Sequence, residues 1–366
     1  MLTAGFLGFA AWGWHRRPAP VPARASVSEA PDQPRCADTP LSMANQHAAA
    51  RLWSLAFAGP PSSQPSAEVD SQVRANITAM LEVDSLDPQY FPRRPALMPQ
   101  LLQAIDDPEA AAARVSRIIA HDPVLTAEIL RLANSSHLCV APIDTIQRAI
   151  VVCGAEVLRG MLATAMLRPV FRASRKNFPR VPRMLWHRTE RATRAAEQYA
   201  LQVRPGDRFE AQMAVLLRAL GPLAVYGATL DVYGRNPQVG PNPALCSELL
   251  VTRAAKASVR IAHDWQMTPR LIAALEGAAD EPLSQVLLVG ELFGTAASLQ
   301  SYRSVTSDEL QEFLAAAQLP PAQTAALWQS LHSIEQLRRI VRAHEAQIAL
   351  LIQRGNMRLF VPVGLG

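Results

Sequence analysis

Lysine is nearly absent from this sequence. Only Lys176 and Lys256 occur among its 36 basic side chains, and the others are arginine. Aromatic residues are also few, at 6 % of the chain, and charged residues make up 18 %, whereas 49 % of the residues are hydrophobic. The apolar mass is therefore mainly alanine, leucine and valine, which excludes a wholly disordered chain and favours helices. A length of 366 residues is enough for about two domains.

The motifs of several catalytic classes are missing. The chain contains no Walker-type loop, no G-x-G-x-x-G and no G-x-S-x-G, so neither a phosphate cradle nor a nucleophile elbow is predicted. The four cysteines form no C-x-x-C pair, which favours reduced thiols in a cytosolic protein over a disulfide framework or a structural zinc site. They are Cys36, Cys139, Cys153 and Cys246.

The N-terminal segment 1–17 is an apolar leader that ends in His-Arg-Arg. As a helix that rises about 1.5 Å per residue, it is too short to cross a hydrocarbon core of about 30 Å. Trp12 and Trp14 suit a membrane interface, so we expect residues 2–14 to tether an otherwise cytoplasmic protein to the inner membrane. A leader without function, or a start codon that trims a longer anchor, predicts the same pattern.

Four further segments follow the leader. Residues 18–42 are rich in proline, alanine and serine, the composition of a flexible, disordered linker. Short helices are expected in 43–89, and the compact part of the chain is expected to span 90–300. The segment 301–366 is predicted to be a helical C-terminal extension that includes a long amphipathic helix over 333–353.

Apolar residues in the compact part recur at three or four positions, which is the helical period. One such stripe from Ile143 to Met161 predicts a single long core helix. Another begins at Phe209 and is predicted to stop at Gly221-Pro222, because proline ends most helices. Alternating strand patterns are not found. The predicted fold class is therefore an all-α bundle of many helices.

Two strings carry a family resemblance. The sequence IIAHDPVLTAEILRLANSS at 118–136, followed by IDTIQRAIVVCG at 143–154, resembles the opening half of bacterial HDOD domains. Leu185-Trp186, Leu216-Leu217 and the stretch 262–265 resemble later landmarks of the same domains. The resemblance covers about 90–300. It implies an HD-like helical signalling module related to HD phosphohydrolases, usually without demonstrated catalysis.

The resemblance also implies where a metal site would lie. The His-Asp dyad of HD relatives falls on Arg218-Ala219, and their earlier histidine falls on Arg188. His187 stands one residue too early, which is a rotation of about 100° on a helix. Arginine cannot ligate a cation, and alanine has no carboxylate. The resemblance thus implies a degenerate ancestral site at these four residues, with no catalytic residue, no bound metal and no cofactor.

The sequence contains two other His-Asp pairs. Asp122 precedes Pro123 and is interpreted as a helix N-cap, whereas His263-Asp264 is interpreted as a helix C-terminus, where a histidine suits the dipole. An alternative hypothesis is a divergent metal-dependent phosphohydrolase that uses His187 and His263-Asp264.

Positive charge is concentrated in one stretch. Residues 159–197 carry ten basic against two acidic side chains, an excess of +8, whereas the whole chain has a net charge of +5. A solvated helix face would explain it, and so would contact with an acidic protein, an anionic membrane surface or nucleic acid. Nucleic acid is the least favoured, since no recognised binding motif accompanies the charge. The candidate contact surface is Arg168, Arg172, Arg175, Lys176, Arg180, Arg183, Arg188 and Arg191.

These observations together favour a non-catalytic regulatory protein of the HDOD type. We expect it to act through protein partners or through a small ligand whose identity the sequence does not indicate. The alternatives are the divergent phosphohydrolase and binding of an anionic surface or nucleic acid through 159–197.

Overall fold

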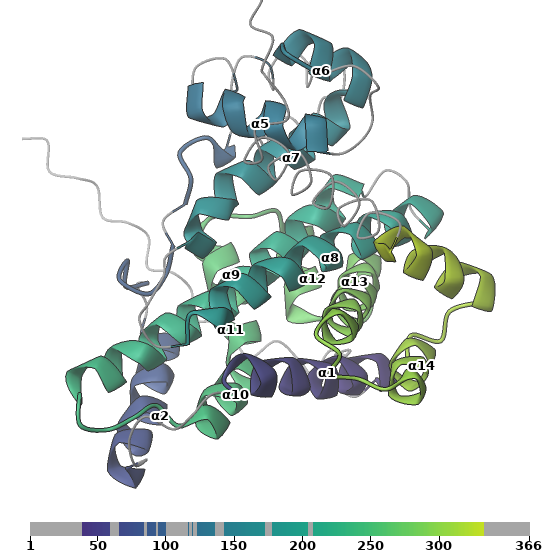
Figure 1. Ribbon diagram of the computed structural model, residues 1–366. Helices are drawn as coiled ribbons and strands as arrows, with labels where there is room; N and C mark the ends of the chain where they lie inside the picture. The colour runs from purple at the N-terminus through teal and green to yellow at the C-terminus, as the bar shows by residue number, and fades with distance from the viewer. Residues whose placement is uncertain are drawn as a thin grey trace, which may run out of the picture. The chain divides into compact units, whose positions relative to one another are not determined.

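Figure 1 shows the computed structural model of the chain. The described residues are 39–58, 66–83, 86–92, 94–99, 116, 119, 123–135, 143–172, 178–203 and 208–332. The leader 2–14 and the helix predicted over 333–353 lie outside the described residues.

Helices are the regular elements of these residues, among which no β-strand occurs. The predicted all-α fold is therefore confirmed. In chain order the helices are α1 (Pro40–Ala56), α2 (Ala67–Glu82), α5 (Pro123–Ser135), α6 (Ile146–Cys153), α7 (Ala155–Leu167), the 3₁₀ helix η2 (Arg168–Arg172), α8 (Arg180–Val203), α9 (Arg208–Arg235), α10 (Pro243–Thr252), α11 (Ala254–Asp264), α12 (Pro269–Glu276), α13 (Pro282–Ser301) and α14 (Ser307–Ala315). Residues 321–332 are also helical.

Helices α8, α9 and α13 form the centre of the bundle, and α8 packs against both of the others. Helices α11 and α12 pack on α9, whereas α5, α6 and α7 gather at one end, at the top of Figure 1. Helix α1 packs against α13 and α10, and α14 contacts both α13 and α1. One hydrophobic core extends from Leu41 to Leu331. The helices before residue 90 and after residue 300 therefore share the core of the central segment.

Helix α1 begins earlier than the sequence suggested. Its first residue is Pro40, which falls inside the segment 18–42 predicted as linker. The side chain of Thr39 accepts a hydrogen bond from the backbone N–H of Ser42 at 3.2 Å, and proline suits a first helical turn because it needs no N–H partner there. The buried indole of Trp53 anchors the helix on the core. The linker prediction is wrong from Pro40 onward.

Helices α8 and α13 pack closely because two glycines face two alanines. A Cβ atom on Gly294 would lie 2.4 Å from the backbone nitrogen of Ala192, and one on Gly290 would lie 2.6 Å from the Cβ atom of Ala196. Separations that short are sterically forbidden, so a larger side chain would push the helices apart. The close contact brings the polar side chains on the adjacent turns of the two helices within reach of each other.

Helix α9 does not stop at Gly221-Pro222, so that prediction is wrong. Pro222 has no N–H to donate to the carbonyl of Arg218, and the hydroxyl of Ser258 on α11 donates to this carbonyl instead, at 2.8 Å. The same hydroxyl lies 3.1 Å from the carbonyl of Ala254. Gly221 leaves room for this approach, because a Cβ atom there would lie 2.3 Å from the Ser258 oxygen. A neighbouring helix thus replaces the donor that proline removes.

The stripe from Ile143 to Met161 is divided between two helices, where the sequence predicted one. Helix α6 ends at Cys153 and α7 begins at Ala155, while Gly154 between them has φ +82° and ψ +154°. A positive φ favours glycine, which lacks the Cβ atom that clashes in this region. The apolar period continues through the break, which is why periodicity alone did not reveal it.

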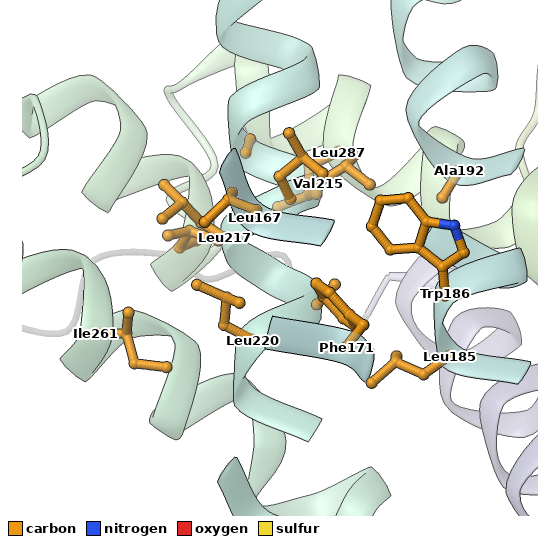
Figure 2. Close-up of a cluster of buried hydrophobic side chains, with 14 of the residues drawn as sticks. Leu167, Phe171, Leu185, Trp186, Ala192, Val215, Leu217, Leu220, Ile261 and Leu287 are labelled. Atoms are coloured by element: carbon orange, nitrogen blue, oxygen red, sulfur yellow. The ribbon is translucent and has the colours of Figure 1, made fainter. Parts of the chain in front are cut away.

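Figure 2 shows the apolar cluster that supports the middle of α8. The rings of Phe171 on η2 and Trp186 on α8 are inclined at 55° with their centroids 5.1 Å apart. Leu185 is also buried there. Further labelled members from α7, α9, α11 and α13 are Leu167, Val215, Leu217, Leu220, Ile261 and Leu287. This packing fixes α8 just before the turn that carries Arg188.

Helices α9 and α13 are long and apolar enough to span a membrane, with mean hydropathies of 1.5 and 1.2. In an apolar 18-residue window of each helix, 89 % of the residues of α9 and 83 % of those of α13 are buried inside the structure. Core helices of soluble proteins have the same properties, so these two helices do not indicate a location.

Candidate functional site

A buried ion pair joins α8 to α13. The Nη2 atom of Arg188 lies 2.6 Å from Oε1 of Glu291, and its Nε–H donates to the hydroxyl of Thr295 at 2.8 Å. Both charged side chains are 8 % exposed. Thr295 lies one helical turn after Glu291, so α13 presents two acceptors on the same face to one guanidinium.

Helix α9 brings a second arginine to the same carboxylate. The Nε atom of Arg218 lies 3.4 Å from Oε2 of Glu291, and its Nη1 donates to the backbone carbonyl of Leu275 at 3.0 Å. Arg218 and Arg188 are the two positions that the resemblance assigns to metal-binding histidines. The structure therefore brings both of them together, on one buried carboxylate, with Ala219 buried next to Arg218.

The charge state of Glu291 follows from this arrangement. Burial alone would raise the pKa of its carboxyl group, but the guanidinium groups of Arg188 and Arg218 outweigh that effect. Its pKa lies below the ordinary value for a glutamate. Glu291 is therefore an anion at neutral pH, and each of its oxygens faces an arginine.

A cavity of about 130 Å³ opens beside the three charged groups. Its walls come from α1, α8, α9, α10, α13 and the start of α11, so α1 covers one side of the site. The Nδ2 group of Asn45 on α1 donates to the carbonyls of Leu41 at 3.1 Å and Leu288 at 2.9 Å, which holds α1 against α13. The lining includes Asn45, Trp53, Arg188, Arg218, Ala255 and Glu291.

The histidines of the alternative hypothesis do not line this cavity. His187 is partly exposed on α8, and His263, at the end of α11, lies 3.4 Å from Glu276 with both side chains more than half exposed. Within the described ranges, no group of three His, Cys, Asp or Glu side chains lies close enough to hold a metal ion. The predicted helix end at His263-Asp264 is confirmed, because α11 ends at Asp264.

A family model of the HDOD domain matches residues 91–280, which is more than half of the chain. The chain belongs to the HDOD family. The matched segment contains Arg188 and Arg218. Asn45 and Glu291 lie outside it, so two of the cavity's polar groups come from helices that flank the HDOD match.

Two solved structures share the fold of this HDOD chain. One is a candidate metal-dependent phosphohydrolase from Shewanella amazonensis, with a TM-score of 0.53, 19 % identity, and coverage of 74 % of this chain and 99 % of that one. The other is an HDOD domain protein of unknown function from Geobacter sulfurreducens, with a TM-score of 0.50, 16 % identity, and coverage of 78 % and 98 %. No curated protein matches the sequence.

The described members of the basic stretch do not all lie on one surface of the HDOD chain. Arg188 is buried in the ion pair, so its placement on a contact surface is wrong. Arg168 pairs with Glu128 at 2.6 Å and lies over the ring of Trp186 at 5.6 Å. Arg191 lies 3.3 Å from the Ser301 hydroxyl.

The other residues of the predicted contact surface fall into two groups. Arg180 and Arg183 are exposed on α8. They and Arg191 make up what we call the outer face of α8. Arg175, Lys176 and the side chain of Arg172 lie outside the described residues.

Sequence reasoning missed Glu291 and Asn45. Glu291 is the only charged residue of α13, and a single charge in an apolar helix signals a buried ion pair, because an unpaired buried charge is too costly. Asn45 had no comparable signal, since asparagine is common on solvent-exposed turns of helices.

Proposed function

We propose that this HDOD chain is a non-catalytic regulatory module that acts through protein or ligand contacts. The observation that supports the proposal is the pairing of Arg188 and Arg218 with Glu291 at the place that the resemblance assigns to a metal centre. A guanidinium stays protonated, offers only donors and repels a divalent cation. The carboxylate that a cation would need is already held by both arginines.

A regulatory role also fits the way in which the cluster connects the central helices. One carboxylate connects α8, α9 and α13, the three central helices, and the cavity beside it is covered by α1. A ligand or partner that changes the position of α1 would therefore affect the centre of the bundle, and no catalysed reaction would be needed.

The outer face of α8 is the surface that we propose for an acidic protein partner. Its arginines lie on one side of a helix whose other side is buried in the core. A protein partner would be co-purified with the full chain from native membranes. Replacing Arg180 and Arg183 by glutamate should abolish this co-purification. The same change at Arg74, an exposed arginine on α2, serves as the matched control. Retention of the partner by the α8 variant would exclude this surface.

Membrane tethering is part of the proposal and rests on the leader alone. Deletion of residues 2–14 should move the protein from the membrane to the soluble fraction. An unchanged distribution would remove the tether from the account.

The alternative, a divergent metal-dependent phosphohydrolase, is tested on the purified full chain. We expect no Mn²⁺-dependent hydrolysis of a simple phosphodiester above that of a His263→Ala variant. Hydrolysis by the unmodified chain that disappears in this variant would contradict the proposed function.

A further inference from the structure

Asn45 on α1 is one of the residues that line the cavity, and its side chain carries a buried acceptor. The residue is 9 % exposed, and its Nδ2 group donates to two backbone carbonyls, those of Leu41 and Leu288. Because both partners are acceptors, the orientation of the amide is fixed and its Oδ1 atom must face elsewhere. That atom is buried and has no hydrogen-bond partner among the described residues. A buried acceptor of this kind is costly unless a ligand or water donates to it.

The wall opposite α1 carries unused donors and an excess of positive charge. Arg188 uses its Nε and Nη2 groups and Arg218 its Nε and Nη1 groups. Arg188 Nη1 and Arg218 Nη2 have no acceptor in the part of the chain that the structure describes. Glu291 is the one acidic residue that lines the cavity, so it balances one of the two cations. The site retains a charge of about +1 in a mostly desolvated place.

The size and the remaining walls of the cavity limit the ligand. Its volume of about 130 Å³ is several times the ~30 Å³ that a water molecule occupies in the liquid. Trp53, Pro222 and Leu288 supply apolar walls. A compact molecule of a few heavy atoms fits this space, with an anionic end and a short body.

We infer that this cavity binds a small oxyanion, a carboxylate or a phosphate, that also carries a hydrogen-bond donor. The Nη1 group of Arg188 and the Nη2 group of Arg218 donate to the anion, and Asn45 Oδ1 accepts from the donor. The inference rests on the proposed function, because it assigns to a ligand the place that a metal would occupy in a catalytic relative. No covalent step is involved.

Binding would couple the ligand to α1. The ligand spans Asn45 on α1 and the arginines on α8 and α9, so it adds a link between α1 and the central helices. Hydrogen exchange of the α1 backbone, residues 40–56, should slow when the site is filled. Anions that act only by screening surface charge would not protect this helix selectively.

The experiment uses the full chain and calorimetric titration with four named probes. Glycolate carries a carboxylate and a hydroxyl donor, acetate lacks the donor, ethylene glycol lacks the charge, and inorganic phosphate tests the other oxyanion. We expect saturable binding of glycolate or phosphate, weaker binding of acetate and none of ethylene glycol. The comparison of glycolate with phosphate identifies the oxyanion.

Two variants locate the binding. Arg218→Gln removes a guanidinium, and Ala255→Leu fills the cavity while it leaves the charged cluster unchanged. Each should weaken binding by at least about tenfold, the value of a lost charged hydrogen bond. Arg74→Gln removes an exposed charge elsewhere and should have no effect. If Arg218→Gln does not fold, Ala255→Leu still decides the question.

The inference is overturned if none of the four probes binds saturably, or if Ala255→Leu binds as tightly as the unmodified chain. A metal-free chain that binds no oxyanion defeats this inference and leaves the proposed function in place. A chain that carries stoichiometric metal at this site defeats the proposed function itself.

Discussion

The guanidinium of Arg188 meets the carboxylate of Glu291 at 2.6 Å in the interior of the bundle, although the two residues are 103 positions apart in the sequence. Both side chains are 8 % exposed, so neither is solvated enough to tolerate the loss of the other. This pair and the second contact from Arg218 join α8, α9 and α13 through one carboxylate.

Replacement of Glu291 by glutamine should destabilise the fold by about 3–5 kcal/mol, because it leaves two buried guanidinium groups without their counter-charge. Urea denaturation at neutral pH measures the change. The control is Glu248→Gln, which breaks an exposed pair with Arg74 and should cost less than about 1 kcal/mol. Equal effects of the two substitutions would contradict the buried ion pair.

Glu128 should make the fold sensitive to acid. Hydrogen bonds from Arg131 and Arg168 outweigh partial burial and lower the pKa of Glu128 to about 2. A carboxylate whose pKa falls on folding stabilises the native state above its unfolded pKa of about 4.3, and this stabilisation is lost as the pH falls toward the folded value. The stability difference between the unmodified chain and Glu128→Gln should therefore be constant near neutral pH and shrink below about pH 4.3. A difference that does not change in acid would refute the assignment.

The contribution of Glu197 to stability should change with pH in the opposite direction to that of Glu128. Burial raises the pKa of this carboxyl group, and the attraction of Arg208 does not fully compensate. A raised folded pKa favours the protonated form, so the contribution of Glu197 to stability falls as the pH rises above its unfolded pKa. At neutral pH, Glu197→Gln should be neutral or stabilising in the same urea assay. A clear loss of stability would show that the pair with Arg208 dominates.

The contact between α8 and α13 predicts a strong effect of a single methyl group. Gly294→Ala places a Cβ atom against the backbone of Ala192 and should destabilise the chain by about 1–3 kcal/mol or more. Gly234 is the matched control, since it is a helical glycine with no atom within 4 Å of its would-be Cβ. Gly234→Ala should stabilise by up to about 1 kcal/mol. Thermal unfolding compares the two, and similar shifts would contradict the close packing.

The continuation of α9 through Pro222 depends on Ser258. Removing its hydroxyl with Ser258→Ala leaves the carbonyl of Arg218 without a donor and should cost about 1–3 kcal/mol. In a Pro222→Ala background the new N–H can donate to the same carbonyl, so the cost should become smaller. A double-mutant cycle measures this coupling, and additive effects would argue against it.

The sequence was sufficient for the fold class and the family, because helical periodicity and the HDOD strings are local signals. The resemblance also singled out Arg188 and Arg218, as the positions that it assigns to the histidines of HD relatives. The sequence could not predict that they meet, since Glu291 lies 73 and 103 residues away and periodicity predicts faces, not partners. The lone charge in α13 was the available signal.

Two local rules failed for physical reasons. Proline ends a helix only when no other group replaces its donor, and Ser258 replaces it at α9. Arg188 was grouped with surface arginines on charge alone, although it stands three residues after Leu185 and four before Ala192, both buried. Its helical position predicts burial, and the charge then requires a partner such as Glu291.

The most direct test of the account is the metal content of the purified full chain after incubation with Mn²⁺ and removal of free ions. The account predicts no stoichiometric metal, because two arginines and their shared carboxylate fill the place that the resemblance assigns to a metal centre. A stoichiometric amount of Mn²⁺ that is lost on His263→Ala would contradict the account, since it would assign a metal centre to residues that the structure places at the surface.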